Sequence, residues 1–181
     1  MKKLILTAAA LALVSFSSFG AEVDVSKSEF KWTGKKVTGK HYGKVPLKSG
    51  TVEMKDGKLV SGVFVADLKN FTVDDLEGEW AQKFLTHMKS EDFFEMKKYP
   101  DAKLKIKSVK GNKATADLTI KGKTNEVKFD IKQEGNTFSG KLVFDRTKFG
   151  MIYGSDSFIK NLGDKAIEND VTVDYKFVVK K

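Results

Sequence analysis

The fold class is indicated most clearly by residues 102–131, AKLKIKSVKGNKATADLTIKGKTNEVKFDI. Apolar residues alternate with charged or polar ones along it, as where Leu104 is followed by Lys105. This period of two is typical of antiparallel strands in a sheet that meets water on one face only. Short turns around Gly111 and Gly122 indicate hairpins between consecutive strands.

The same alternation continues on both sides of this stretch. It recurs downstream in residues 138–144 and 171–179, and less regularly upstream in residues 30–32, 37–45 and 52–68. So many one-sided strands must hide their apolar face, either between two stacked sheets or inside a closed barrel. Consecutive hairpins favour closure, and we expect an all-β fold, an eight-stranded antiparallel barrel with one covering helix.

The stretch from Asp74 to Ser90 predicts that helix. Asp74 and Asp75 suit the N-cap position, and the helix is expected to end near Ser90. Four apolar side chains recur at helical spacing, namely Trp80, Phe84, Leu85 and Met88. We expect this helix to cover one mouth of the barrel, and the long irregular stretch 148–170 to form a second flap.

The small residues on the expected inner faces are Ala102, Ala114, Ala116 and Gly140. They leave two interpretations open: neighbouring phenylalanines fill the barrel, or the free volume belongs to a ligand. Few charged residues fall on these faces, so any cavity is expected to suit a long hydrocarbon. His41, Tyr42 and His87, with lysines at the rim, would form its polar end, facing an anionic or quinone-like head group.

The first twenty residues read as a secretory signal peptide. Lys2 and Lys3 precede an apolar run from Leu4 to Phe16, and Ser18 and Gly20 supply the small residues of a cleavage site. We expect cleavage near Gly20, a periplasmic or secreted protein, and one domain over residues 21–181. Losing two lysines would lower the net charge of +9 to about +7.

The types of basic residue in the sequence argue against nucleic-acid binding. Arg146 is the only arginine, whereas readers of nucleic acid rely on arginine for bidentate contacts. Lysines spread along strand faces are expected to form a solvated surface, with anionic lipid head groups as the functional alternative. The chain has no cysteine, which excludes disulfides and thiolate metal sites.

Catalytic motifs are missing from the sequence. It contains no nucleophile elbow, no HExxH motif and no glycine-rich phosphate loop. A metal site of His41 and His87, completed by Glu91 or Asp92, is a weak alternative, because two distant histidines seldom meet. We therefore expect no enzyme, no cofactor and no metal.

Three motifs resemble the YceI-like family. They are HMKSEDFFEMKKYPDAKLKIKSV at 87–109, ADLTIKGKTNEVKFDI at 116–131 and FDRTKFGMIYG at 144–154. The resemblance implies a lipocalin-like barrel with a helical cover, usually periplasmic or secreted, that binds a polyisoprenoid or another long-chain amphiphile in an elongated pore. It also implies a link to the handling, transport or storage of isoprenoid quinones. His41, Gly43, His87 and the segment 90–94 match family positions near the mouth.

We therefore expect a binding protein for a long apolar amphiphile: a polyisoprenoid, an isoprenoid quinone or an acyl lipid. An anionic membrane surface and a second copy of the chain are further partners to consider. The alternatives are a structural or stress-protective exported protein with a filled barrel, and an enzyme or metal protein using the two histidines. The residues expected to line the pore are Trp32, His41, Phe84, His87, Met88, Phe94, Leu104, Ile106, Ala116, Leu118, Phe129, Ile131, Phe138, Leu142 and Phe144.

Overall fold

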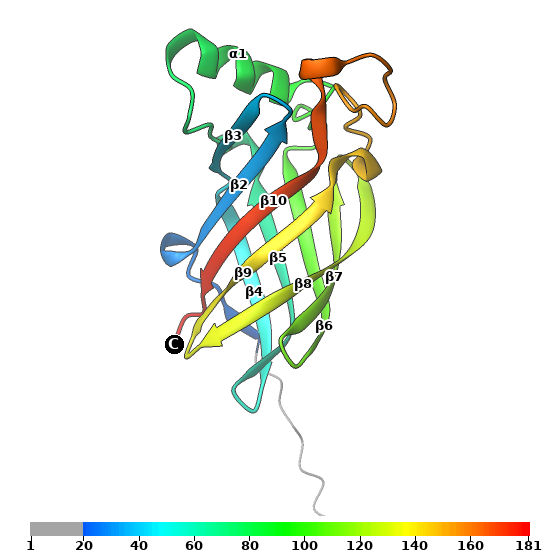
Figure 1. Ribbon diagram of the computed structural model, residues 1–181. Coiled ribbons are helices and arrows are strands. Elements are labelled where there is room, and N and C mark those ends of the chain that lie inside the picture. Colours follow the sequence, from blue (N-terminus) through cyan, green and yellow to red (C-terminus); the bar gives the residue numbers. More distant parts are fainter. Residues whose placement is uncertain (1–19) are drawn as a thin grey trace, which may run out of the picture.

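A single antiparallel sheet of ten strands makes up most of the protein in the computed structural model, which describes residues 20–181 (Figure 1). The predicted signal peptide falls almost entirely on residues 1–19, outside the described residues. The strands are β1 (Gly20–Glu22), β2 (Glu29–Lys36), β3 (Gly39–Lys44), β4 (Leu47–Lys55), β5 (Lys58–Asp67), β6 (Asp101–Lys110), β7 (Lys113–Ile120), β8 (Lys123–Glu134), β9 (Thr137–Asp145) and β10 (Ile167–Val178).

The all-β barrel fold is confirmed, but the sheet has ten strands where we predicted eight. Two long stretches of the wall are each divided in two. β1 and β2 are separated by a short turn of 3-10 helix (Val25–Lys27), and β3 and β4 by Val45 and Pro46. Proline has no N–H to give to a strand ladder, which explains the second break. Since β1 pairs with β4 and β2 with β3, the ten strands fill eight positions around the wall.

Both nominal edges of the sheet, at β1 and β3, are covered. At the lower end in Figure 1, Val23 bridges to Val179 beside β10. At the upper end, the outer edge of β3 is covered by the segment 72–75: the Thr72 N–H donates to the Lys44 carbonyl (2.9 Å) and the Asp74 N–H to the Tyr42 carbonyl (2.8 Å). No long edge of β3 is therefore left for pairing with another chain.

Aromatic side chains fill the lower part of the barrel. Phe138 and Phe177 stack with ring centroids 4.8 Å apart, and Phe64 packs edge-on against Phe177 at 4.8 Å. Phe138 and Phe177 are almost completely buried. The filled interior predicted as an alternative thus exists, but in this part of the barrel.

One helix and one long loop lie over the upper end. The helix α1 (Gly78–Lys89) ends at the C-cap Ser90 as predicted, but its N-cap is Glu77. The prediction that Asp74 and Asp75 cap it was wrong. The Asp75 carboxylate accepts instead from His41 and Tyr42 of β3, and the Asp74 carboxylate accepts from the Thr72 hydroxyl. The loop between β9 and β10, residues 146–166, lies at the same end as α1 (Figure 1).

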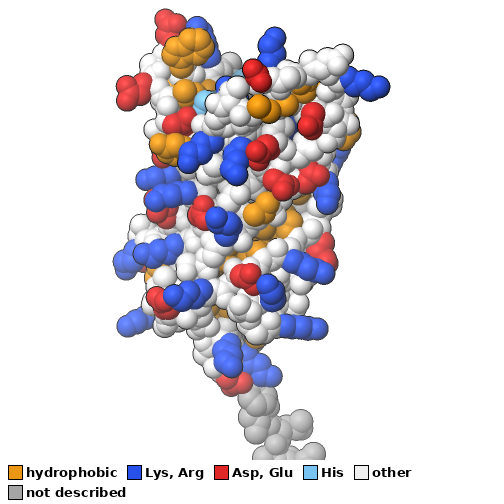
Figure 2. All heavy atoms as spheres, in the orientation of Figure 1, with side chains coloured by type: hydrophobic (Ala, Val, Ile, Leu, Met, Phe, Trp, Pro, Cys, Tyr) orange, Lys and Arg blue, Asp and Glu red, His pale blue; other side chains and the backbone are white. Residues whose placement is uncertain are grey.

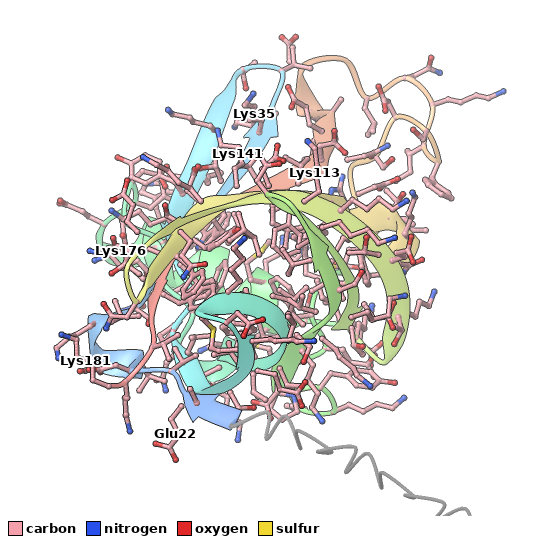
Figure 3. The ribbon with its side chains drawn as sticks, turned by 90° about the horizontal axis from the view of Figure 1, so that it is seen from below. Glu22, Lys35, Lys113, Lys141, Lys176 and Lys181 are labelled. Carbon is pink, nitrogen blue, oxygen red and sulfur yellow. The ribbon has the colours of Figure 1, made fainter. Side chains whose placement is uncertain are left out.

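The outer wall is lined by lysines paired with acidic residues across strands. The Nζ of Lys107 lies 2.8 Å from Asp117 and 3.0 Å from Glu126. Figure 3, seen from the end opposite α1, shows labelled lysines such as Lys113 and Lys141 on the outside of the ring. Exposed pairs of this kind add little stability, so the fold depends on its interior.

A prediction follows for Gly43 in β3. A Cβ at this position would lie 2.2 Å from the Thr72 carbonyl oxygen and 2.9 Å from the Trp32 indole nitrogen, which donates to that oxygen (2.9 Å). Gly43→Ala should therefore lower the free energy of unfolding by about 1–3 kcal/mol, as overpacking does. Urea unfolding measures this. The control is Gly34→Ala, whose Cβ would meet only Trp32 at 3.8 Å; equal stability of the two variants would contradict the account.

Candidate functional site

The upper part of the barrel encloses a cavity of about 530 Å³. Its walls come from the inner faces of the strands, and its cover from α1, the segment 93–94 and the loop after β9. The volume falls within the range of small-molecule sites, roughly 300–1,000 Å³. Aromatic and aliphatic side chains form most of the lining.

The structure brings together twelve of the fifteen residues predicted to line a pore. They are Trp32, His41, Phe84, His87, Met88, Phe94, Leu104, Ile106, Leu118, Phe129, Leu142 and Phe144. The other three, Ala116, Ile131 and Phe138, are buried in the described barrel but lie outside the cavity lining. Alternation predicts that a side chain faces the barrel interior, but it does not predict where the side chain lies along the barrel axis.

The small residues that suggested free volume do not, for the most part, create it. Of the four small residues named above, Ala102, Ala114, Ala116 and Gly140, only Ala102 lines the cavity. No free volume remains beside Gly140, because a Cβ there would lie 2.2 Å from the Asp130 carbonyl oxygen and 2.6 Å from the Tyr175 hydroxyl oxygen. That hydroxyl donates to the Asp130 carbonyl (2.8 Å), and burial raises the pKa of Tyr175 above its ordinary value. The cavity arises instead where Ala66 and Ala102 face each other in the register of β5 and β6.

Lining residues missed by the sequence analysis come largely from β2, β4, β5 and β10. They include Phe30, Leu47, Phe64, Ala66, Val173 and Tyr175. The alternation in β10 is visible in the sequence, and its inward-facing residues could have been added to the predicted lining. The irregular pattern of β4 and β5 gave no such signal, because two register shifts interrupt their pairing.

Charged side chains gather where the cavity opens. Lys35 and Lys36 at the end of β2 lie opposite the start of β10, where Glu168 follows Ile167. Asp164 and Lys165 from the loop after β9 complete this rim. An apolar cavity with a charged rim can hold a hydrocarbon chain inside and leave a polar group in contact with water.

His41 joins β3 to the segment before α1. Its Nδ1 lies 2.7 Å from an Asp75 carboxylate oxygen, and the other oxygen accepts the Tyr42 N–H (2.9 Å). Burial alone would raise the pKa of Asp75, but these hydrogen bonds and the His41 charge outweigh it, so that pKa lies below its ordinary value. The His41 ring also packs on Phe84 of α1, at 5.0 Å between centroids.

His87 makes a separate pair with Asp92. Its Nε2 lies 3.0 Å from Asp92, and its ring packs edge-on against Phe93 and Tyr153, at 4.9 and 4.5 Å. Each histidine thus contacts a different carboxylate. Among residues 20–181, no group of three or more potential ligands is placed to hold a metal ion.

Arg146 holds the loop after β9, a role that the sequence analysis did not assign. Its guanidinium donates to the backbone carbonyls of Met151 (2.5 Å), Tyr153 (2.8 Å), Ile167 (3.0 Å) and Glu168 (3.1 Å). Burial lowers the pKa of Arg146 from its ordinary value, against the raising effect of Asp145. One signal in the sequence could have indicated this role: Arg146 is the sole arginine of a lysine-rich chain. The planar guanidinium can donate to several carbonyls at once, whereas a lysine ammonium cannot replace this geometry.

We predict that Asp75 makes stability depend on pH in the acid range. Because its folded pKa is lowered, its contribution is present above its ordinary pKa of about 3.9 and is lost as the pH falls through the folded value. The difference in free energy of unfolding between the protein and Asp75→Asn should therefore be largest near neutral pH and shrink below about pH 4. Urea unfolding at several pH values tests this. The exposed Asp156→Asn serves as control, and a difference that grows with acidity would contradict the assignment.

We predict that Arg146→Met releases the loop over the cavity. It should lower the free energy of unfolding by at least about 2 kcal/mol, because a buried carbonyl left without a donor costs roughly 1–3 kcal/mol. Amides of residues 150–166 should exchange hydrogen faster. Lys148→Met, an exposed change in the same turn, is the control. Unchanged exchange in Arg146→Met would show that other contacts hold the loop.

Comparisons with solved structures return proteins of the same architecture. BcnA of Burkholderia cenocepacia superposes with a TM-score of 0.67 and 25% identity, over 87% of this chain and 99% of that one. A polyisoprenoid binding domain from Saccharophagus degradans gives 0.60 at 14% identity, over 88% and 98%. The YCEI protein of Campylobacter jejuni gives 0.53 at 17% identity, over 100% and 99%. The two likenesses below 25% identity show the fold alone.

Curated relatives match over shorter regions. A UPF0312 protein of Staphylococcus aureus is 37% identical over 76 residues, which is 36% of this chain and 44% of that protein. Another from the same species is 47% identical over 49 residues, or 27% and 29%. This chain therefore spans less than half the length of these relatives. A model of the YceI-like domain matches residues 22–179, which include every strand from β2 to β10, and the chain belongs to the YceI-like family.

Proposed function

We propose that this protein binds one long-chain amphiphile, an isoprenoid or acyl lipid, in the upper cavity of the barrel, for transport or storage. The observation that carries the proposal is an apolar cavity of about 530 Å³ inside a barrel whose other end is packed with aromatic rings. A packed core does not leave such a volume without a cost in stability. A hydrocarbon chain would remove that cost.

The placement of polar groups supports an amphiphile over a sugar or a nucleotide. Polar ligands need several polar partners in the depth of a site. Here the deep lining is formed by residues such as Phe64, Phe129 and Leu142, whereas Lys36, Asp164 and Lys165 lie at the rim. The ligand would therefore insert its chain and keep its head near α1. The likeness to the polyisoprenoid binding domain from Saccharophagus degradans agrees with this class of ligand.

A binding role also fits the residues better than catalysis. The two histidines of the described chain are engaged with Asp75 and Asp92 beside aromatic rings. These pairs orient the cover of the cavity and leave its depth apolar. A reacting group would need a polar partner there to take or give a proton.

Export to the periplasm or the outside is a further part of the proposal. Its support is the sequence of the first twenty residues, with Lys2 and Lys3 before an apolar run and small residues at Ser18 and Gly20. Within residues 20–181, no helix has the length and apolar character to cross a bilayer. Mass spectrometry of the protein from its native host would give a mature N-terminus at Ala21 if the proposed cleavage occurs.

The direct test of binding is the content of the protein purified gently from that host. We expect native mass spectrometry to show a one-to-one complex, and an organic extract of the protein to release an isoprenoid or acyl chain. A bare chain that also takes up no prenyl or acyl lipid on addition would refute the proposal.

Two variants locate the ligand. Ala66→Phe and Ala102→Phe each add a ring at the facing pair of small residues, so we expect a folded protein that retains little lipid. Val63→Phe, on the exposed outer side of the same strand, is the matched control and should bind normally. Normal binding by both Ala66→Phe and Ala102→Phe would place the lipid elsewhere.

A further inference from the structure

We propose that the upper end of the barrel docks on the surface of an anionic lipid bilayer. The three most exposed large hydrophobic side chains among residues 20–181 are Trp80 (70% exposed), Val37 (65%) and Phe158 (58%). They belong to α1, to the turn between β2 and β3, and to the loop after β9. Figure 1 shows these three segments at the same end of the molecule.

Other exposed apolar residues extend this set. Ile152, Tyr153 and Ile159 are also exposed and belong to the loop after β9. Figure 2 shows hydrophobic side chains exposed over the α1 end, close to charged ones. We call these six residues the apolar rim: Val37, Trp80, Ile152, Tyr153, Phe158 and Ile159.

Trp80 is exposed against expectation. The helical spacing placed it in the apolar stripe with Phe84 and Met88, and those two do line the cavity. Trp80 points away from the barrel instead, and its ring meets only the Lys83 ammonium, at 5.2 Å, among the aromatic and cation contacts found for it. An outward tryptophan is costly in water but favourable at the head-group level of a bilayer, where tryptophan and tyrosine rings concentrate.

Lysines flank the apolar rim in each of the three segments. Lys36 and Lys40 stand on either side of Val37, Lys83 lies over Trp80, and Lys160 follows Ile159. Long lysine side chains can bury their stems and place the ammonium at lipid phosphates. The turn between β2 and β3 is the most basic part, with three lysines and no acidic residue in positions 35–40. Basic residues beside apolar ones are the pattern that binds anionic membrane surfaces.

The same pattern disfavours a second copy of the chain as the occupant. A two-fold dimer centred on the turn between β2 and β3 would place its lysines against the same lysines of the second copy. Like charges brought together in this way suppress association. Three separate apolar tips also fit a fluid interface better than a rigid partner surface.

Docking in this orientation would turn the cavity opening toward the bilayer. Tyr153 both lines the cavity and belongs to the apolar rim, and Val37 directly follows Lys36 at the opening. A lipid could then pass between membrane and barrel without crossing open water. The docking itself does not require an occupied cavity, so it can be tested apart from ligand binding.

Tryptophan fluorescence gives a specific measurement. The chain has two tryptophans, and Trp32 is buried, so a response to vesicles reports Trp80. Vesicles of phosphatidylglycerol and phosphatidylcholine should shift the emission to shorter wavelength, and brominated lipids should quench it. Vesicles of phosphatidylcholine alone should bind much more weakly. An emission spectrum that stays unchanged with anionic vesicles would overturn the proposal.

Variants separate docking from general attraction of a basic protein. Trp80→Ser combined with Phe158→Ser should weaken sedimentation with anionic vesicles about tenfold or more. The double control Val63→Ser with Val143→Ser removes two exposed apolar side chains from the barrel wall and should leave binding unchanged. Equal binding of both double variants would overturn the proposal, as would a dimer in solution that Trp80→Ser dissociates. A protein that docks but carries no lipid would refute the proposed function and leave this inference standing.

Discussion

Aromatic packing at one end of the barrel determines where its interior can hold a ligand. Phe138 stacks on Phe177 in the lower interior, and Phe64 packs edge-on against Phe177. Phe64 and Phe177 also line the cavity, so its volume ends at these rings. The lining residues contributed by α1, the segment 93–94 and the loop after β9 lie at the other end, which indicates that a ligand enters there. The two ends of the cavity therefore differ: the end next to the aromatic rings is apolar, and the end near α1 carries charged residues.

The cover at that end is held by polar contacts that would be costly to lose. The Asp75 carboxylate accepts from both His41 and the Tyr42 backbone, which fixes the segment before α1 on β3. Arg146 does the same for the loop after β9 through four backbone carbonyls. These bonds lie at the border between buried and wet regions, where unpaired polar groups destabilise a fold. The cover is therefore positioned by hydrogen bonds and only partly by apolar packing.

Much of the fold could be predicted from the sequence, because a period of two records which side chains face inward. It gave Leu104, Leu118 and Phe129 their places on the cavity wall, and helical spacing did so for Phe84. The alternation does not predict how far along the barrel axis a side chain lies. Ala116, Ile131 and Phe138 were expected beside the ligand for that reason. The lack of free volume near Gly140 depends in part on Tyr175, far away in the sequence. Nor could periodicity show that Asp75 would bond to His41 instead of capping the helix, since that choice depends on tertiary packing.

In the function proposed above, a hydrocarbon chain occupies the upper cavity with its head at the α1 end. A crystal structure of the protein purified from its native host tests this most directly. We expect elongated density running from the level of Phe129 and Leu142 to the rim at Lys36 and Lys165. An upper cavity containing ordered water, or one closed by rearranged side chains, would contradict it.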